Sequence, residues 1–284
     1  MDKLVNITIN GKSVEVPDHY TIMQAADKIG IDIPRLCFLK GINENASCRV
    51  CVVEIAGMRS LKNSCSVEVG SILNREGTAT IYTNSKRVRT AVRQTLELIA
   101  ANHRFDCWKC PREHNCELLA LLRRFSIDNK MAESGEFAKK LPIVNESEAI
   151  VFDSSKCVLC GRCIAACEKL AGTGVLNFNE RGFVTCVGPA LNHDIEDSGC
   201  IYCGKCIQAC PTGAIREKEQ LDYVAEELAN HENYVVATFA PAVRAAIGEE
   251  FENPIGTNCE GKLYAALHEL GFDDLTDVNF GADL

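Results

Sequence analysis

The chain has 284 residues, of which 46% are hydrophobic and 24% are charged, as is ordinary for a globular protein. It has no apolar run of the roughly eighteen residues that a membrane span needs, and its start lacks the apolar core of a signal peptide, so we expect a cytoplasmic protein. The formal net charge of −9 argues against nucleic acid as a partner.

The 17 cysteines are the most unusual feature of this composition. Cytosolic thiols are kept reduced, and clustered cysteines in a cytosolic protein more often bind metal or take part in catalysis than form disulfides. An odd number also fits a framework made only of disulfides poorly. Metal ligation is therefore the better interpretation.

The amino-terminal segment has the pattern of a β-hairpin followed by a helix. Apolar residues lie on both sides of Asn10-Gly11, a dipeptide typical of two-residue hairpin turns. Thr21 is placed to cap the helix that follows, and a strand-like run covers residues 51–55. This order resembles the β-grasp domain of plant-type ferredoxins, which we assign to residues 1–78.

Four cysteines of this domain are separated by ten, two and thirteen residues. Three lie in one loop and the fourth lies further on, which suits a [2Fe–2S] cluster. The spacing differs from the plant-type pattern, so spacing alone leaves zinc as an alternative. The four are Cys37, Cys48, Cys51 and Cys65.

Beyond this domain the apolar residues change to a helical period. Val88, Val92 and Leu96 recur on one face. The basic residues between them are explained most simply as a solvated helix face. A second helix is predicted over 118–125, and a polar linker at about 129–140. The basic residues are Lys86, Arg87, Arg89 and Arg93.

Three closely spaced cysteines follow the first of these helices, with a histidine just upstream. Three thiolates leave one corner of a [4Fe–4S] cube unfilled, and imidazole is a competent iron ligand. Spacing leaves open whether this histidine is the ligand, or a surface residue beside a zinc site or a water-filled corner. We assign residues 79–141 to this domain. The four residues are His103, Cys107, Cys110 and Cys116.

An internal repeat marks the third domain, which we assign to residues 142–220. Each copy has the Cys-x2-Cys-x2-Cys-x3-Cys spacing of bacterial ferredoxins, in which the fourth cysteine serves the other cluster. Zinc more typically uses two separated Cys-x2-Cys pairs. One [4Fe–4S] cube is therefore expected on Cys157, Cys160, Cys163 and Cys210. The other is expected on Cys167, Cys200, Cys203 and Cys206.

Two cysteines, Cys186 and Cys259, have no partners at ligand spacing, and we expect free thiols. Trp108 lies between two proposed ligands and is interpreted as a hydrophobic shield. The sequence has no Gly-x-Gly-x-x-Gly motif and no phosphate-binding loop. Because clusters move single electrons whereas NAD(P)H gives a hydride, we expect FMN or FAD and the NAD(P) site on partner chains.

Residues 221–284 change to an α/β pattern. From Glu217 onward there are 15 acidic and 3 basic residues, a balance of −12, whereas the rest of the chain has a balance of +3 and holds every proposed ligand. A basic scaffold suits anionic clusters, because buried charge needs compensation. Helices are predicted over 221–228, 242–251 and 262–270, with a strand over 234–239.

The order of these motifs resembles the amino-terminal half of complex [FeFe]-hydrogenases. It is also similar to the large iron–sulfur subunit of NADH dehydrogenase and to NAD-linked formate dehydrogenases. The resemblance implies that His103 is the fourth ligand of its cube and that the Cys37 set holds a [2Fe–2S] cluster. Residues 239–251 and 261–273 look like the opening of the H-cluster domain, whose cysteine motifs are not found before Leu284. We therefore expect no complete active site in this chain.

The expected fold is α+β and multidomain, with a β-grasp domain, a small helical domain, a two-cube ferredoxin domain and a short α/β remnant of a hydrogenase-like domain. The resemblance implies an electron-transfer subunit of a flavin-based, electron-bifurcating NAD(P)H/ferredoxin oxidoreductase, with the transhydrogenase type favoured. Its partners would be a flavoprotein, a small [2Fe–2S] subunit and ferredoxin, with no membrane involved. The alternatives are the electron-input part of a bifurcating hydrogenase, and a zinc-binding or redox-sensing interaction module.

Overall fold

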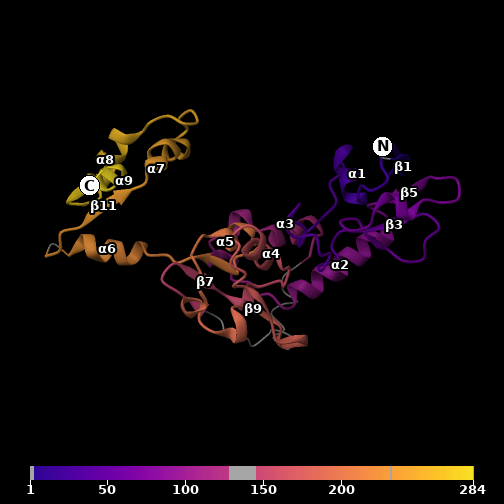
Figure 1. Ribbon diagram of the computed structural model, residues 1–284, viewed down its shortest axis with the longest axis horizontal. Helices are drawn as coiled ribbons and strands as arrows, with labels where there is room; N and C mark the ends of the chain where they lie inside the picture. The colour runs from indigo at the N-terminus through magenta and orange to yellow at the C-terminus, as the bar shows by residue number, and fades with distance from the viewer. Residues whose placement is uncertain (1–2, 128–144, 231, 284) are drawn as a thin grey trace. The chain divides into compact units, whose positions relative to one another are not determined.

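The computed structural model describes residues 3–127, 145–230 and 232–283 (Figure 1). The chain divides into two compact units, Met1–Lys218 and Glu219–Leu284, and each is described by itself. The linker predicted at 129–140 lies outside the described residues. In the described ranges, no helix has the length and apolar character needed to cross a membrane.

A five-stranded mixed sheet forms the amino-terminal domain (Figure 1). Its strand order is β2-β1-β5-β3-β4, with β1 antiparallel to β2 and parallel to β5. The strands are β1 (Leu4–Ile9), β2 (Lys12–Pro17), β3 (Val52–Ile55), β4 (Lys62–Asn63) and β5 (Ala79–Tyr82).

The predicted hairpin and the helix after it are both present. Asn10 and Gly11 have φ angles of 49° and 83°, and two successive positive φ angles are what a type I′ turn requires. Helix α1 (Ile22–Lys28) begins with a capping box, in which the Thr21 hydroxyl accepts from the Gln24 N–H and the Gln24 side chain accepts from the Thr21 N–H.

The sheet extends slightly beyond the boundary expected at residue 78. Strand β5 lies between β1 and β3, and its Ala79 and Ile81 are buried in the same core as Ile7 and Val53. This central place depends on pairing with strands far away in the sequence, which the local apolar pattern does not reveal.

The helical segment shares a core with the sheet domain. Ser85 caps α2 (Lys86–Ala100) by accepting from the Val88 N–H at 3.2 Å, and the predicted apolar stripe of α2 is buried. Helix α3 (Glu117–Arg124) packs in the same core. The buried residues are Leu36, Val50, Val52, Val88, Val92, Leu96, Ala100, Leu118, Leu121 and Leu122.

The repeat forms two short helices, α4 (Arg162–Lys169) and α5 (Lys205–Ala209), each capped by a glycine with a left-handed backbone. Two small sheets flank them, with orders β10-β7-β6 and β8-β9. Their strands are β6 (Asn145–Glu146), β7 (Ile150–Phe152), β8 (Asn177–Asn179), β9 (Cys186–Gly188) and β10 (Ile215–Glu217).

The second compact unit has the predicted α/β pattern. Its parallel strands β11 and β12 are joined through α7 and α8, and its small core contains Phe239, Leu263 and Leu275. The elements are α6 (Leu221–Ala229), β11 (Val236–Phe239), α7 (Pro241–Ala246), α8 (Glu260–Glu269), β12 (Asp274–Asp277) and α9 (Val278–Asp283).

Candidate iron–sulfur sites

The four cysteines of the sheet domain form two pairs. The Sγ atoms of Cys51 and Cys65 are 3.3 Å apart, and the Cys48 N–H donates to the Sγ of Cys37 at 3.5 Å. A two-iron cluster has four thiolate ligands, two on each iron. The structure therefore brings the predicted ligands together in the grouping that a [2Fe–2S] cluster needs.

Pairing shifts the pKa values of these thiols in opposite directions. Hydrogen bonding to Cys48, which outweighs burial, lowers the pKa of Cys37 to about 5, and the same contact raises the pKa of Cys48. Hydrogen bonding to Cys65 lowers the pKa of Cys51 to about 6 and raises the pKa of Cys65. Each pair thus favours one thiolate over the other, and metal binding would displace the remaining proton.

Two short 3₁₀ turns carry the cysteines of the helical segment. They are η2 (Cys107–Lys109) and η3 (Glu113–Asn115), and Cys116 follows as the cap of α3, with its Sγ accepting from the Leu119 N–H at 3.5 Å. Burial, followed by lesser effects that include the charge of Cys110, raises the pKa of Cys107 and of Cys116. The three thiols are therefore close enough to interact.

His103 has the properties of a metal-binding histidine. Burial, and then the nearby ammonium of Lys156, lowers the pKa of His103 to about 4, and the Lys156 backbone hydrogen-bonds the imidazole. Its buried Nδ1 has no hydrogen-bond partner in the described part of the chain. A metal-binding imidazole is neutral, with its second nitrogen held by a hydrogen bond. These are properties of a metal-binding histidine, and its place as the fourth ligand of the cube stays a prediction.

Each of the two cubes predicted for the repeat has a cavity lined by its four ligands. The first cavity also has apolar walls that include Phe152 and Val187, and the second has walls that include Ile150 and Ile195. The fourth cysteine of each run lies with three from the other run, as the bacterial ferredoxin pattern predicts. The first set is Cys157, Cys160, Cys163 and Cys210, and the second is Cys167, Cys200, Cys203 and Cys206.

Burial makes these cavities unfavourable for bare thiolates. It raises the pKa of Cys160 to about 12, that of Cys206 to about 11, and that of Cys163 well above its ordinary value. A cation that replaces the protons would compensate the buried charge. Across the residues that the structure describes, no three His, Cys, Asp or Glu side chains converge as ligands of a single metal ion.

The [2Fe–2S] loop is joined to the first cube site by one buried side chain. The Asn43 amide donates to the Cys37 carbonyl at 2.8 Å and to the Cys160 carbonyl at 3.0 Å. Ser47 also donates to the Cys160 carbonyl, at 3.4 Å. Sequence reasoning missed Asn43, because no spacing links it to the repeat.

The predicted histidine-ligated site, that of His103, Cys107, Cys110 and Cys116, also contacts this cube site. Arg112 donates to the Cys210 carbonyl at 2.6 Å, and the Glu117 N–H donates to the Pro211 carbonyl at 3.0 Å. A Cβ built on Gly213 would lie only 2.5 Å from the Sγ of Cys110. Both outer sites are therefore in contact with the site that contains Cys210.

An ion-pair network centred on the buried Lys156 lies between His103 and the first cube site. Lys156, only 5% exposed, is 2.8 Å from Asp106, and Arg104 pairs with Asp106 at 3.0 Å and with Asp153 at 2.9 Å. Lys156 also directly precedes Cys157. Its charge is thus placed to act on both sites, a role that the sequence did not indicate.

The remaining sulfur and aromatic residues lie apart from the two cube cavities. The Sγ of Cys186 contacts the Asn192 side chain at 3.2 Å, and Cys259 is buried in the second compact unit. The side chain of Trp108 is 75% exposed, with the Lys109 ammonium 4.5 Å from its ring centre. This exposure does not fit the interpretation of Trp108 as a shield, because a shielding ring buries one face.

Four stretches of the chain match known protein families. Residues 2–73 match a 2Fe-2S iron-sulfur cluster binding domain, and residues 93–130 match the NADH-ubiquinone oxidoreductase-G iron-sulfur binding region. Residues 156–214 match a 4Fe-4S dicluster domain, and residues 233–284 match the C-terminal domain of the iron only hydrogenase large subunit.

Whole-chain similarity extends to hydrogenases. The chain is 42% identical to the NADP-reducing hydrogenase subunit HndD of Solidesulfovibrio fructosivorans, over 99% of this chain and 48% of the relative. The match therefore runs along nearly all of this chain. It is also 38% identical to iron hydrogenase 1 of Clostridium pasteurianum, over 98% of this chain and 47% of the relative. The chain thus spans about half the length of these relatives.

A solved structure shares the fold at low sequence identity. It is the NAD+-reducing [NiFe]-hydrogenase in the H2-reduced state, with a TM-score of 0.66 and 23% identity over 75% of this chain and 87% of the other. The predicted resemblance and the iron–sulfur character of the chain are confirmed. The individual ligands stay predictions.

Proposed function

We propose that the chain is the iron–sulfur electron-transfer subunit of a soluble, cytoplasmic, electron-bifurcating NAD(P)H/ferredoxin oxidoreductase complex of the transhydrogenase type. It would hold one [2Fe–2S] and three [4Fe–4S] clusters on the four ligand sets described above, and such clusters exchange single electrons. A flavoprotein partner would supply FMN or FAD and bind NAD(P)H. A small [2Fe–2S] subunit and ferredoxin would be the further partners.

The observation that carries this proposal is the contact of both outer sites with one inner site. Asn43 bonds the loops of Cys37 and Cys160, and Gly213 touches Cys110 from beside Cys210. A structural zinc protein gains nothing from such adjacency, whereas an electron relay requires neighbouring centres. The arrangement therefore supports a relay with two outer centres and a common inner one.

Metal and sulfide analysis tests whether the chain holds iron–sulfur clusters. The purified chain should contain about fourteen irons with a matching amount of acid-labile sulfide. Stoichiometric zinc without sulfide would instead support an interaction module. The native complex should contain a flavoprotein and should couple NAD(P)H oxidation to ferredoxin reduction.

A second candidate is the electron-input part of a bifurcating hydrogenase. The match of residues 233–284 to the iron only hydrogenase domain favours it. Sequencing the native gene discriminates between the two. A reading frame that continues past Leu284 into more cysteine motifs, with hydrogen evolution by the native complex, would support the hydrogenase; a stop codon there would support the transhydrogenase type.

A further inference from the structure

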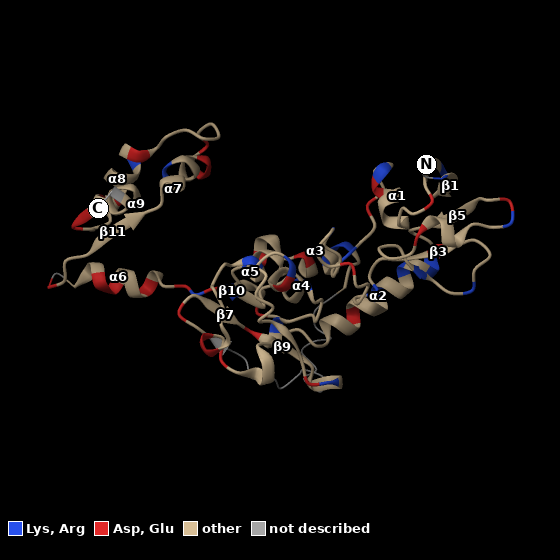
Figure 2. Ribbon diagram, viewed as in Figure 1, with Lys and Arg blue, Asp and Glu red and all other residues tan. Residues whose placement is uncertain are grey.

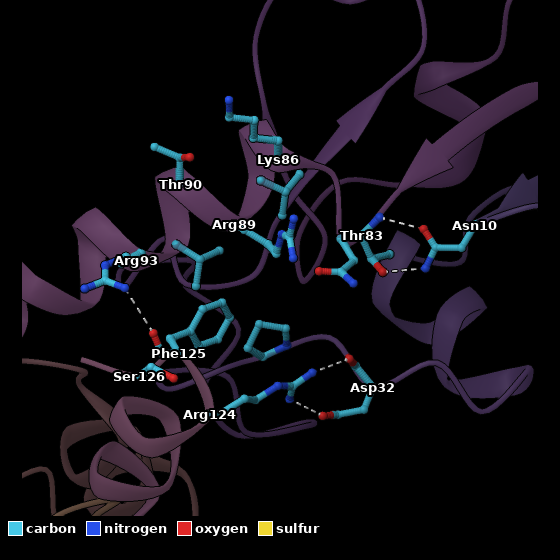
Figure 3. Close-up of a pocket in the computed structure, with 14 residues that line it drawn as sticks. Asn10, Asp32, Thr83, Lys86, Arg89, Thr90, Arg93, Arg124, Phe125 and Ser126 are labelled. Atoms are coloured by element: carbon cyan, nitrogen blue, oxygen red, sulfur yellow. Dashed lines mark hydrogen bonds and ion pairs between the residues drawn. The ribbon is translucent and has the colours of Figure 1, made fainter. Parts of the chain in front are cut away.

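A basic cleft of about 650 Å³ lies where the sheet domain meets α2 and the end of α3 (Figure 3). Asn10 and Thr83 form one wall and are joined by hydrogen bonds of 2.7 and 2.9 Å. Asp32 is the single acidic residue among those that line the cleft. Four basic residues line it, namely Lys86, Arg89, Arg93 and Arg124.

Two of these basic side chains are neutralised by neighbours. Arg124 pairs with Asp32 at 2.5 Å, and Arg93 pairs with Glu97 at 2.8 Å. Lys86 and Arg89, both exposed, make no side-chain hydrogen bond or ion pair in the described part of the chain. The cleft therefore carries a positive charge, and Figure 2 shows basic residues gathered along the same part of α2.

The apolar stripe of α2, which adjoins these basic residues, packs toward both outer cluster sites. The core that buries Val88 and Leu96 is also contacted by Cys48 of the [2Fe–2S] site and by Cys116 of the histidine-ligated site. A protein seated in the cleft would therefore lie against the helix whose buried residues contact ligands of both outer sites.

We propose that this cleft, with the exposed basic residues of α2, is the docking surface for an acidic electron-carrier protein. The proposal rests on the proposed relay function. Charge complementarity steers such partners and raises their association rate. A small phosphate ligand is less favoured, because none of the lining residues has a buried polar atom without a partner and the basic run continues to Arg87, outside the cleft.

The test is stopped-flow reduction of the cluster-loaded chain by a reduced acidic bacterial ferredoxin. Lys86→Glu/Arg89→Glu should slow the second-order reaction roughly tenfold at low salt, and the difference should shrink at high salt. The matched control is Lys3→Glu/Arg75→Glu, two exposed residues of the same domain outside the cleft. This control changes the net charge equally and should stay within about twofold of the parent chain.

Methyl viologen radical cation serves as a second reductant. It distinguishes a failure of the proposed docking surface from a failure of the proposed relay. Its reaction should be as fast or faster in Lys86→Glu/Arg89→Glu, because the surface becomes more acidic. Equal slowing of both double variants with ferredoxin, or no slowing of either, would overturn the docking surface while viologen still reduced the clusters. Clusters that viologen cannot reduce would instead count against the relay itself. Saturable binding of pyrophosphate to the parent chain, together with no slowing of ferredoxin in Lys86→Glu/Arg89→Glu, would overturn the docking surface and assign the cleft to small anions.

Discussion

The two outer sites are built in different ways. In the sheet domain, Cys37, Cys51 and Cys65 are each at most 2% exposed and belong to the domain's own apolar structure. In the helical segment, the three thiols are only partly buried and lie on short 3₁₀ turns. The first site is mostly enclosed by its own domain and meets the repeat domain through Asn43 and Ser47, whereas the ligand turns of the second contact the repeat domain directly.

This difference has a physical origin in the amount of regular structure. The sheet supplies backbone pairing and an apolar core around its cysteines. The 3₁₀ turns supply few internal bonds, and the neighbouring contacts come from Arg112, Glu117 and Gly213. We therefore expect damage at the junction to affect the histidine-ligated site first.

Gly213→Ala is the strongest test of this comparison. The added Cβ would meet the Sγ of Cys110 at 2.5 Å, so the backbone or the ligand must move. Such overpacking costs about 1–3 kcal/mol, and we expect loss of the EPR signal of the histidine-ligated cube with retention of the [2Fe–2S] signal. Gly261→Ala, where a Cβ meets open space, is the control. Equal loss of both signals would contradict the comparison.

His103→Cys sharpens the comparison by changing the charge of one site only. The cube should remain bound, since cysteine is also an iron ligand, but its reduction potential should fall because thiolate adds a negative charge. Redox titration followed by EPR measures the potential. An unchanged set of potentials would remove His103 from the ligands.

Lys156→Met should act in the same direction with a smaller effect. The variant removes a buried positive charge beside His103 and Cys157. Loss of this charge makes it less favourable to add an electron to a neighbouring cluster. The potentials of the two neighbouring cubes should fall, while that of the [2Fe–2S] cluster should change least. Lys156→Arg, which keeps the charge, should recover most of the shift. A fall confined to thermal stability, with potentials unchanged, would make Lys156 purely structural.

Cys186→Ser and Cys259→Ser should have the smallest effect. Neither thiol lines a cube cavity, so the iron content should match that of the parent chain. Iron analysis of both variants checks this. Loss of about two to four irons in either one would show that a cluster has been assigned the wrong ligands.

Local rules account for what the sequence predicted well. The Asn10-Gly11 turn, the Thr21 cap and the apolar stripe of α2 each depend on residues within a few positions of one another, and all three are present. The ligand spacing of the repeat likewise lies within eleven-residue runs. Family matches then confirmed the 2Fe-2S and 4Fe-4S regions.

What the sequence did not reveal depends on distant contacts. Strand β5 occupies the middle of its sheet only because β1 and β3 pair on either side of it. Asn43, Lys156 and Gly213 carry no spacing signal, yet each lies at a junction between ligand loops. Such roles arise from folding of the whole unit, which periodicity cannot describe.

The two bonds made by Asn43 also limit how the sheet domain can be exchanged. Its amide donates to the nearby Cys37 carbonyl and to the Cys160 carbonyl, which is 117 positions further along the sequence. A free-standing ferredoxin grafted in its place would supply its own cluster but would leave the Cys160 carbonyl without this donor. A chimeric protein with an exchanged sheet domain therefore needs an amide side chain at the same point of the loop, so that the new domain can bond the Cys160 carbonyl.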